Sequence, residues 1–376
     1  MQMKRLTEHP LYREGLRMIA TASFLPWDTL QGSSLFISGA TGMIGSCLID
    51  TVMYQNQEFG LQCKIYALSR NRKKACSRFA AWSDSPLLQI VEGDVNNPIP
   101  FHDKVTCDYV LHLASNTHPV AYATDPIGTI TANIIGTQNM LNLAIQISAK
   151  RFLFASSNEI YGENRGDQEL FDESYLGYID CNTLRAGYPE SKRCGEALCQ
   201  AYRKQKGLDV VIARLTRSFG PTLQTSDTKA MSQFLRNGLH KENIVLKSDG
   251  NQFYSYTYTA DAVTGLLTIL LKGVDGQAYN IADKRCDIRL KELASLIASA
   301  SGTRVVFDLP DAIESAGFSK ATKARLDGSK LRKLGWEIMF PMECAVERTL
   351  VILKDAEAIG ESRSCISSET GVRQGE

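Results

Sequence analysis

The residues with the clearest capacity for chemistry are a tyrosine and a lysine four positions apart. Tyr188 and Lys192 lie in RAGYPESKRCGEALCQAY, which predicts a helix from about Pro189 onward, since proline is tolerated in a first turn. At this spacing the two side chains share one face of the helix. An ammonium group beside a phenol stabilises the phenolate and lowers its pKa, so the pair could remove a hydroxyl proton near neutral pH.

A second set of polar residues follows an apolar run in FASSNEIYG, residues 154–162. Residues 151–155 predict a buried strand, so Ser157, Asn158 and Glu159 stand where that strand leaves the core. In open parallel α/β sheets, ligands bind at this edge. Ser157 could hydrogen-bond a reacting oxygen, and Glu159 could either act on a substrate or only bond the loop backbone.

A glycine-rich turn, GATGMIG, directly follows one predicted strand and opens a predicted helix. Its glycines are three apart, in a GxxGxxG spacing. Without side chains the backbone can turn tightly and approach a pyrophosphate, whose charge the helix N-terminus favours. A tight turn without a ligand is the alternative. The strand and helix context favours a dinucleotide site, to which we assign Gly39, Thr41, Gly42, Met43, Ile44 and Gly45.

The end of the second predicted strand carries no acidic residue. A site of this kind usually holds the ribose 2′-hydroxyl with Asp or Glu there, but the sequence has Ser69, Arg70, Asn71 and Arg72. Arg70 or Arg72 could meet a 2′-phosphate, so both NAD and NADP stay open, and a solvated basic loop is an equal alternative. Asp94, after the third strand, could contact the adenine amino group or form a turn.

The segments that must position these residues alternate between strands and helices. Predicted strands are SSLFIS, KIYALS, LLQIVEGD, DYVLHLAS, RFLFASS and GLDVVIARL, with helical segments such as ITANIIGTQNMLNLAIQI between them. This alternation predicts an α/β fold, a Rossmann-type doubly wound parallel sheet with right-handed crossovers. Further along, the helix DIRLKELASLIASASG and the strand RVVFDL indicate a smaller α/β substrate-binding lobe.

Together these segments resemble the extended short-chain dehydrogenase/reductase family, specifically its nucleotide-sugar epimerases, dehydratases and decarboxylases. The resemblance runs from about residue 35 to about residue 353, through GATGMIG, LHLAS, DPIGTITANIIGTQNML, FASSNEIYG, RAGYPESKR, RSFGP and YTYTAD. YATDPIGT and RAGYPESKRCGEALCQAY are most similar to the UDP-glucuronate decarboxylase branch. The resemblance implies oxidation at C4 of a sugar on a nucleoside diphosphate, by NAD or NADP that stays tightly bound and is recycled.

The same resemblance assigns roles to residues and implies a homodimer packed through the helices after Asn133 and after Tyr188. Ser157, Tyr188 and Lys192 would be the family's catalytic Ser/Thr, Tyr and Lys, and Asn133 its structural active-site Asn. The expected catalytic residues are therefore Ser157, Glu159, Tyr188 and Lys192. The other cofactor contacts are expected from Arg70, Asp94, Val95, Leu113, Ala114, Ser115, Asn133, Tyr188 and Lys192.

The fate of the 4-keto sugar depends on residues beside Ser157. Tyr188 would take the hydroxyl proton while hydride leaves the carbon. A ketone acidifies the neighbouring C–H, or makes a neighbouring carboxylate a β-keto acid that loses carbon dioxide. Dehydratases of the family have Asp where this chain has Asn158, which cannot protonate a leaving hydroxyl. Simple 4-epimerases usually lack an acid at the position of Glu159, so Glu159 favours a decarboxylase-like reaction.

The sequence is also compatible with other reactions. An NDP-sugar 4-epimerase is the main alternative. A 4,6-dehydratase, a 4-reductase and a non-catalytic dinucleotide-binding regulator are less favoured, the last because a sensor would need only the glycine turn and not Ser157, Tyr188 and Lys192.

Two departures from the family pattern concern substrate binding. Tyr254 stands where the family usually has an Arg that contacts the diphosphate or the substrate carboxylate, whereas Arg217 stands where an Asn usually precedes aromatic-Gly-Pro. We hypothesise that Arg217 supplies the missing charge; an Arg paired with an acid at the edge of the core is an equal alternative. Asn158, Arg217 and Tyr254 are thus the expected substrate-binding residues, with loops at 223–229 and 251–258 closing over the nucleotide.

A chain of 376 residues, 44% of them hydrophobic, can bury a large core and form two lobes. We expect an N-terminal extension (1–32), a dinucleotide-binding Rossmann domain (33–219), a lobe that mainly binds the nucleotide sugar (220–354) and a flexible tail (355–376). A net charge of +1 without charged blocks argues against nucleic-acid or membrane partners. Ten cysteines without CxxC pairs indicate reduced thiols and no metal, and the apolar run LLTILL is too short to span a bilayer. We therefore expect a cytoplasmic protein.

Overall fold

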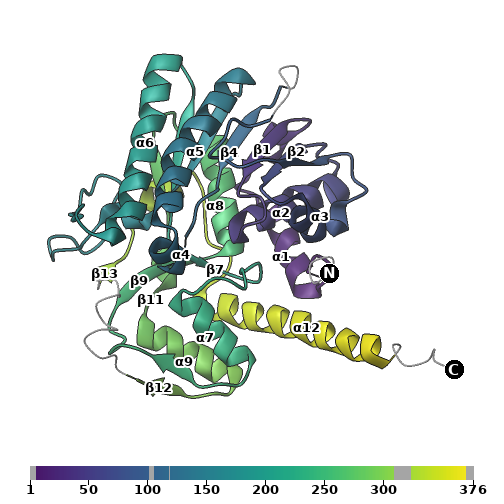
Figure 1. Ribbon diagram of the computed structural model, residues 1–376, viewed down its shortest axis with the longest axis vertical. Helices are drawn as coiled ribbons and strands as arrows, with labels where there is room; N and C mark the ends of the chain where they lie inside the picture. The colour runs from purple at the N-terminus through teal and green to yellow at the C-terminus, as the bar shows by residue number, and fades with distance from the viewer. Residues whose placement is uncertain (1–5, 101–105, 118, 309–322, 370–376) are drawn as a thin grey trace.

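The large lobe is a seven-stranded sheet between two layers of helices (Figure 1). The computed structural model describes residues 6–100, 106–117, 119–308 and 323–369. All strand pairs of this sheet are parallel. From one edge to the other the order is β10 (Ala278–Ile281), β6 (Val210–Leu215), β5 (Arg151–Ser157), β4 (Tyr109–His112), β1 (Ser34–Ser38), β2 (Lys64–Ser69) and β3 (Leu88–Glu92).

The strand order reverses direction between β1 and β4. The chain runs from β1 outward to β2 and β3, and then returns to place β4 on the other side of β1. At such a switch point the two connecting segments leave in opposite directions, and a crevice opens at the carboxyl ends of the strands. The predicted doubly wound sheet is confirmed, and its crevice lies where GATGMIG follows β1.

Alternate residues of the strands feed two separate cores. On one face, Leu35 and Ile37 pack with residues of α2 (Met43–Phe59) and α8 (Thr259–Lys272). On the other face, Phe36 packs with residues of α5 (Pro126–Gln146), which lies against α6 (Gly187–Lys206). Two shorter helices follow strands of this lobe, α3 (Arg72–Arg78) and α4 (Pro119–Thr124). Apolar side chains on both faces of the central strands keep them buried, as is usual in parallel sheets, whereas Gln89 and Glu92 of the edge strand β3 are exposed.

The smaller lobe is built around β9 (Phe253–Tyr258). It pairs in parallel with β7 (Arg217–Phe219) and β13 (Lys323–Ala324), and antiparallel with β11 (Asp287–Arg289). A second pair joins β8 (Ile244–Leu246) to β12 (Val305–Phe307), packed by α7 (Ala230–Leu239) and α9 (Leu290–Ser301). The predicted loop at 251–258 is therefore wrong over most of its length, because its buried alternating tyrosines make it the central strand of this lobe.

The chain returns to the large lobe after β9. Helix α8 packs against α2, and β10 then forms the edge of the large sheet beside β6. The range 220–354, expected to be mainly a separate lobe, thus contains a segment that completes the seven-stranded sheet. Short 3₁₀ segments occur at η1 (Trp27–Leu30), η2 (Ala80–Trp82), η3 (Asn158–Tyr161), η4 (Leu184–Ala186) and η5 (Lys284–Cys286).

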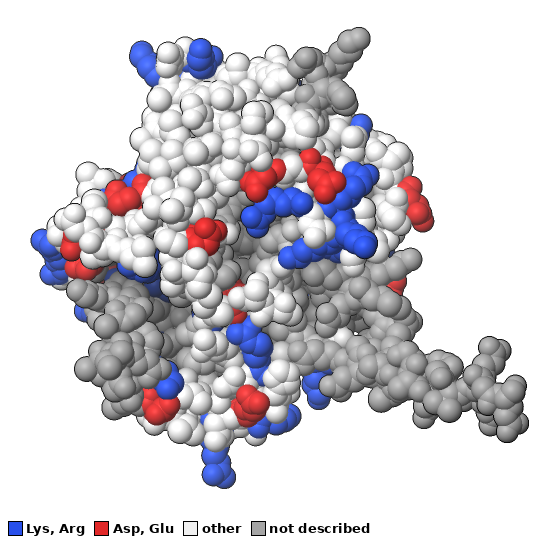
Figure 2. Space-filling model, viewed as in Figure 1, with Lys and Arg blue, Asp and Glu red and all other residues white. Residues whose placement is uncertain are grey.

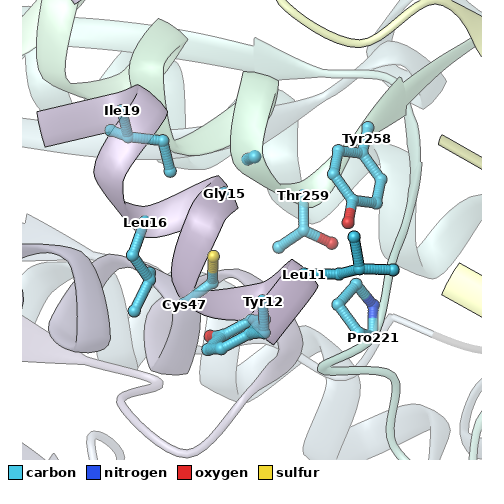
Figure 3. A pocket seen from close by; sticks show the side chains of 10 residues that line it. Leu11, Tyr12, Gly15, Leu16, Ile19, Cys47, Pro221, Tyr258 and Thr259 are labelled. Atoms are coloured by element: carbon cyan, nitrogen blue, oxygen red, sulfur yellow. The ribbon is translucent and has the colours of Figure 1, made fainter. Parts of the chain in front are cut away.

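The N-terminal extension forms α1 (Pro10–Ala20), which packs on α2, α8 and α12. Figure 3 shows Tyr12 and Leu16 of α1 beside Cys47 of α2 and Thr259 of α8, around a small, mostly apolar pocket. The extension is therefore an integral layer of the fold.

The C-terminal part consists of α11 (Ser329–Arg332) and the long helix α12 (Met342–Glu369), which points away from the body in Figure 1. Arg348 joins α12 to α1 through Glu14 at 2.8 Å. The backbone of residues 355–369 continues this helix, whereas the sequence predicted a flexible tail; the rest of that prediction, 370–376, lies outside the described residues.

Candidate active site

The glycine turn has the close packing that a dinucleotide site needs. Gly39 has φ +68°, and a Cβ there would lie 2.7 Å from the backbone of Leu113 and Ala114. A Cβ on Gly45 would collide with the carbonyl oxygen of Gly39. Gly42 begins α2, and its N–H donates to that same oxygen at 2.9 Å. The loops after β1 and β4 therefore meet over a turn without side chains, a cradle that fits a pyrophosphate.

A buried serine and histidine, at the ends of β1 and β4, hold the two loops of this turn together. Ser38 Oγ accepts hydrogen bonds from the N–H groups of Leu113 (3.2 Å) and Ala114 (3.3 Å). The same Oγ shares a hydrogen bond with His112 Nδ1, 2.7 Å away. Burial, and secondarily the charge of Lys192, lower the pKa of His112 to about 3, so the ring is neutral. The sequence analysis did not single out this pair.

Asn133 of α5 links three elements of the site. Its Oδ1 accepts from the hydroxyl of Ser115, after β4, at 2.8 Å, and its Nδ2 donates to Ser191 Oγ of α6 at 2.9 Å. Ser191 in turn donates to the carbonyl of Tyr188 at 2.9 Å. This fully buried amide thus links the start of α6 to the segment after β4.

Tyr188 is buried at the start of α6 and faces Ser157. Burial, and then the carboxylate of Glu159, raise the pKa of Tyr188 above its ordinary value; hydrogen bonds with Ser157 and Ser115 act in the opposite direction. The pKa expected from the sequence was a lowered one, with Lys192 as its cause. That direction is wrong for the free protein, because the desolvation of the phenol outweighs every charge near it.

The Lys192 ammonium bonds to the backbone of β5. Its Nζ donates to the carbonyl of Ala155 at 2.8 Å and lies 4.9 Å from the centre of the Phe154 ring. Burial lowers the pKa of Lys192 to about 7, against the opposing effects of Glu196 and Cys199. Lys192 can therefore take up or release a proton near neutrality.

Two residues that the sequence analysis missed cover Tyr188. The ring of Tyr122, on α4, stacks on Tyr188 with centroids 4.8 Å apart and planes 28° apart. The guanidinium of Arg185 lies 4.8 Å from the centre of the Tyr122 ring. Both residues belong to quoted motifs, YATDPIGT and RAGYPESKR, which were the only signal available. The resulting stack separates the phenol of Tyr188 from solvent.

Glu159 contacts this stack through Arg185. Its Oε2 accepts from Arg185 Nη2 at 2.7 Å. The charge of Glu159 also contributes to raising the pKa of three tyrosines, Tyr122, Tyr188 and Tyr254. Glu159 thus pairs with Arg185 next to the Tyr122–Tyr188 stack, and its catalytic role remains a prediction.

Arg217 and Tyr254 meet in the smaller lobe. They come from the paired strands β7 and β9, and the guanidinium carbon of Arg217 lies 3.6 Å from the centre of the Tyr254 ring. Arg217 Nη1 is buried and has no hydrogen-bond partner among the described residues. Within those residues no ion pair of Arg217 is found either, so the alternative of an Arg paired with an acid has no support. Asn158 is buried at the start of η3.

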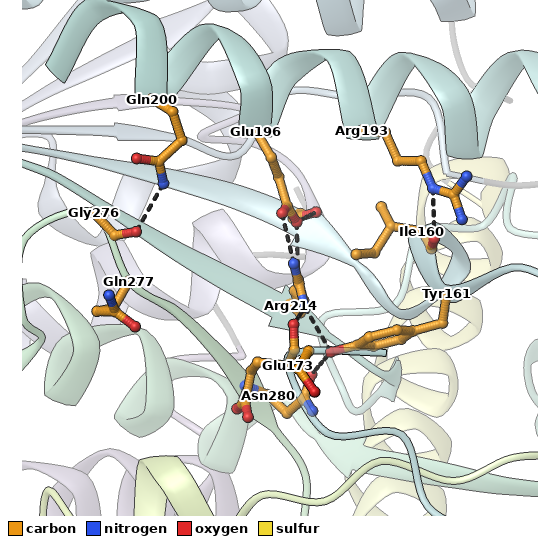
Figure 4. A network of polar contacts seen from close by, with 12 residues as sticks. Ile160, Tyr161, Glu173, Arg193, Glu196, Gln200, Arg214, Gly276, Gln277 and Asn280 are labelled. Atoms are coloured by element: carbon orange, nitrogen blue, oxygen red, sulfur yellow. Dashed lines mark hydrogen bonds and ion pairs between the residues drawn. The ribbon is translucent and has the colours of Figure 1, made fainter. Parts of the chain in front are cut away.

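A polar network holds the loop after β5 (Figure 4). Glu196 of α6 accepts two hydrogen bonds from Arg214 of β6, at 3.0 and 2.8 Å, and one from Ser156 at 2.6 Å. Arg214 Nη1 donates to the hydroxyl of Tyr161 in η3 at 2.9 Å, and Tyr161 donates to Asn280 of β10 at 2.6 Å. The segment that carries Ser157, Asn158 and Glu159 is thereby tied to both strands at the sheet edge.

The remaining predicted cofactor residues follow β1, β2 and β3. Asp94 accepts from the N–H of Asn96 at 2.9 Å, which is the turn-forming role weighed against adenine binding. Val95 is buried and would meet a Cβ on Gly136. Arg70 is exposed at the end of β2. Thr41, Met43 and Ile44 are partly buried in the glycine turn.

Two other observations concern metals and membranes. Within the described part of the chain, no group of three or more His, Cys, Asp or Glu residues could hold a metal ion. Among the helices described, none combines the length and the apolar character that crossing a membrane requires.

A glycine turn at the switch point of a doubly wound sheet, beside a Ser, Tyr and Lys set, defines the class of dinucleotide-dependent enzymes that oxidise and reduce hydroxyl groups. The chain belongs to the NAD dependent epimerase/dehydratase family, whose model matches residues 35–282. The family, and with it the enzyme class that uses a nicotinamide dinucleotide, NAD or NADP, are confirmed as expected from the sequence.

Individual relatives carry more specific names. The chain is 30% identical to UDP-glucuronic acid decarboxylase 1 of Danio rerio over 84% of this chain and 71% of the relative. It is 31% identical to UDP-glucuronic acid decarboxylase 3 of Arabidopsis thaliana over 81% of this chain and 84% of the relative.

Solved structures share the fold at lower sequence identity. One is UDP-glucuronic acid 4-epimerase from Bacillus cereus in complex with UDP-glucuronic acid and NAD, with a TM-score of 0.72, 21% identity, and 86% of this chain and 99% of that chain covered. Another is a double mutant of dTDP-glucose 4,6-dehydratase from Streptomyces venezuelae with NAD bound, with a TM-score of 0.73, 23% identity, and coverage of 87% and 99%.

Proposed function

We propose that this enzyme oxidises C4 of a nucleoside-diphosphate sugar and decarboxylates the resulting 4-keto uronic acid, as the names of its relatives suggest for UDP-glucuronate. The observation that carries this proposal is the position of Glu159 two residues after Ser157: its carboxylate accepts a hydrogen bond from Arg185, and its charge acts on the phenol of Tyr188. An acid at this point fits a reaction that moves a proton at a second carbon, whereas simple 4-epimerisation needs none.

The proposed reaction begins with oxidation at C4 of the sugar. Tyr188 takes the proton of the C4 hydroxyl while Ser157 hydrogen-bonds the same oxygen, and the C4–H leaves as hydride. When bound in the cradle of the glycine turn, NAD or NADP would supply the acceptor for that hydride and the donor for the closing reduction. The 4-ketone accepts the electron pair of the C5–carboxylate bond as carbon dioxide leaves. The C5 carbanion equivalent is then protonated; the reaction takes this proton from solvent, and Glu159 is the residue to which we assign its uptake and transfer to C5.

The raised pKa of Tyr188 is consistent with a gated base. In the free protein the phenol stays protonated, because burial and Glu159 both disfavour its ionised form. Arg185, which pairs with Glu159, acts in the other direction on the same phenol. A change in the pairing of Glu159 on substrate binding would therefore shift the basicity of Tyr188.

We also propose that Arg217 binds the anionic part of the substrate, the diphosphate or the carboxylate. Its stacking on Tyr254 fixes the plane of the guanidinium, and its buried Nη1 has a free donor within the described residues. A planar guanidinium with spare donors suits bidentate binding of an oxyanion. Asn158 and Tyr254 complete the proposed substrate contacts.

This role for Arg217 predicts that Arg217→Lys keeps part of the substrate affinity and Arg217→Ala raises KM at least tenfold, since a charge-assisted hydrogen bond contributes roughly 1.5–3 kcal/mol. Arg289→Ala, which removes a guanidinium stacked on Phe253 in the same lobe, is the matched control. An unchanged KM and kcat for Arg217→Ala would contradict the assignment.

A 4-epimerase is the second candidate, and Tyr254 favours it. The family position that handles the carboxylate in decarboxylases carries no charge here. If the carboxylate is held loosely, the 4-keto sugar keeps it and is reduced from its other face.

We also propose that the chain forms a homodimer through helices α5 and α6. Ile135 and Ile145 on α5 are partly exposed, which is compatible with such an interface. Light scattering after size exclusion tests that assembly. The cytoplasmic location and the division of the chain at residues 32, 219 and 354 also remain predictions.

The reaction is tested by incubating the purified protein with UDP-glucuronate, in parallel with NAD and with NADP, while NMR follows the sugar and a sensor follows carbon dioxide. A UDP-pentose with released gas supports decarboxylation, and UDP-galacturonate without gas supports epimerisation. No conversion with either cofactor, in a protein that still binds a dinucleotide, would overturn the choice of substrate.

A further inference from the structure

The carboxyl end of β2 lies beside the glycine turn, where a bound dinucleotide places its adenosine ribose. β2 pairs with β1 in parallel, with Ile37 opposite Ala67, so the residues after β2 lie next to the turn that follows β1. An acid at the end of this strand holds the two ribose hydroxyls and repels a phosphate on the 2′ oxygen. This chain has Ser69 as the last residue of β2 and Arg70 after it.

The structure distinguishes between the two arginines of this segment. Arg72 Nη1 donates to the carbonyl of Ile90 at 3.1 Å, which holds Arg72 along the edge of β3. Arg70 is exposed, and no hydrogen bond or ion pair of its side chain is found in the described part of the chain. Arg70 is thus the guanidinium at this strand end that is available to a ligand.

The backbone around Arg70 is held by its neighbours. The N–H of Asn71 donates to Ser69 Oγ at 3.3 Å, and Ser69 Oγ donates to the carbonyl of Asn71 at 3.1 Å. The Asn71 side chain accepts from the N–H of Lys74 at 2.8 Å. Arg70 therefore projects from a defined turn, so less conformational entropy is lost when it binds an anion.

The local charge also favours an anion. Four of the five residues at 70–74 are basic and none is acidic. Figure 2 shows basic side chains gathered, among acidic ones, on the face where Figure 1 places α2 and α3. A phosphate monoester carries between one and two negative charges near neutral pH, and guanidinium binds it bidentately.

We propose that the cofactor of this enzyme is the 2′-phosphorylated dinucleotide NADP, with its 2′-phosphate bound by Arg70 and with room left for it by Ser69. This goes beyond the family assignment, because the two solved neighbours described above were crystallised with NAD. It rests on the dinucleotide site alone and is independent of the sugar reaction. The alternative is that Glu92, which lies opposite Ser69 in the β2–β3 register, holds a ribose hydroxyl of NAD.

Binding without any sugar tests the proposal. Isothermal titration of nucleotide-stripped protein compares NADP with NAD, and adenosine 2′,5′-bisphosphate with 5′-AMP. We expect at least tenfold tighter binding of each 2′-phosphorylated ligand. We also expect this preference to shrink as salt rises, since the contact is exposed. The nucleotide released from protein as purified, identified by mass spectrometry, should be NADP.

Variants assign the preference to residues. Arg70→Ala should weaken NADP at least tenfold and leave NAD unchanged, and Ser69→Asp should reverse the preference. Arg17→Ala, an exposed arginine on α1, is the matched control for charge. Retained NAD binding shows that Arg70→Ala is folded.

Two outcomes would overturn the proposal. One is equal or tighter binding of NAD in the unmodified protein. The other is an NADP preference that Arg70→Ala leaves intact. Loss of NAD affinity in Glu92→Gln would then place the ribose hydroxyls on β3. Failure of the sugar reaction leaves these binding results unaffected, so the two proposals fail separately.

Discussion

At the scale of single residues, the hydroxyl of Tyr188 carries the proposed chemistry. Tyr188→Phe keeps the ring that stacks on Tyr122 and removes only the proton acceptor. We expect turnover to fall by about 10²–10⁴-fold, the usual contribution of a positioned acid–base group, while dinucleotide binding is retained. Single-turnover kinetics and calorimetry measure the two effects. Tyr178→Phe, at a tyrosine that is 47% exposed, is the control, and equal losses in both variants would contradict the role.

Lys192 gives the free protein a pH-dependent stability. Its pKa is about 7 in the folded chain against 10.5 as an ordinary value, so between these pH values the unfolded chain binds the additional proton. Lys192 therefore makes the free energy of unfolding rise with pH across this window, by on the order of 1 kcal/mol per unit.

The apolar variant Lys192→Met lacks this dependence. We expect its stability advantage over the unmodified protein to be largest below pH 7 and to shrink toward pH 10. Denaturant unfolding of the dinucleotide-free proteins at several pH values checks this. Parallel curves for the two proteins would mean that Lys192 is charged in the fold.

Much of the site was predictable from sequence, because its residues are tied to local patterns. Tyr188 and Lys192 share a helix face through their spacing, and Ser157 ends a strand. Tyr122 and Arg185 were not predictable, since their roles depend on a stack between α4 and the start of α6 that no spacing encodes. The direction of the Tyr188 pKa was also missed, because burial of the phenol is a tertiary property.

At the scale of elements, the glycine turn depends on contacts that a single methyl group would break. Gly45 and Gly15 both lie in helices, but a Cβ on Gly45 would collide with Gly39 O, whereas on Gly15 it would lie 3.7 Å from the side chain of Arg348. We expect Gly45→Ala to weaken dinucleotide binding more than tenfold and Gly15→Ala to leave it unchanged. Calorimetry with NAD and NADP measures both. Unimpaired binding in Gly45→Ala would show that the turn can shift.

The sequence predicts the strands and helices of the large lobe better than those of the smaller lobe. The buried strands of the large sheet and helix α5 were predicted because apolar runs and helical spacing alternate clearly. The smaller lobe was harder. Strand β9 contains Tyr254, Tyr256 and Tyr258. Its hydroxyl-rich sequence predicts a loop, but the tyrosines are buried and the strand pairs with β7 and β11.

At the scale of the whole molecule, α1 contributes to a core shared with α2 and α8. Leu16 is 2% exposed, whereas its neighbour Arg17 is exposed. We expect Leu16→Ala to lower the free energy of unfolding by about 2–5 kcal/mol through lost burial and a cavity. Arg17→Ala should change it by less than about 0.5 kcal/mol. Chemical denaturation measures both, and a small effect at Leu16 would show that α1 is dispensable.

Strand β10 completes the large sheet from a distant part of the chain, after the smaller lobe has begun. A protease cut at an exposed point of the connection between β7 and α7 would therefore leave two pieces that each need the other. The first piece would expose the edge of β6, a template for aggregation, and the second would carry the strand that covers it. The two pieces, made separately and mixed, are thus candidates for fragment complementation, with recovery of dinucleotide binding as the signal of reassembly.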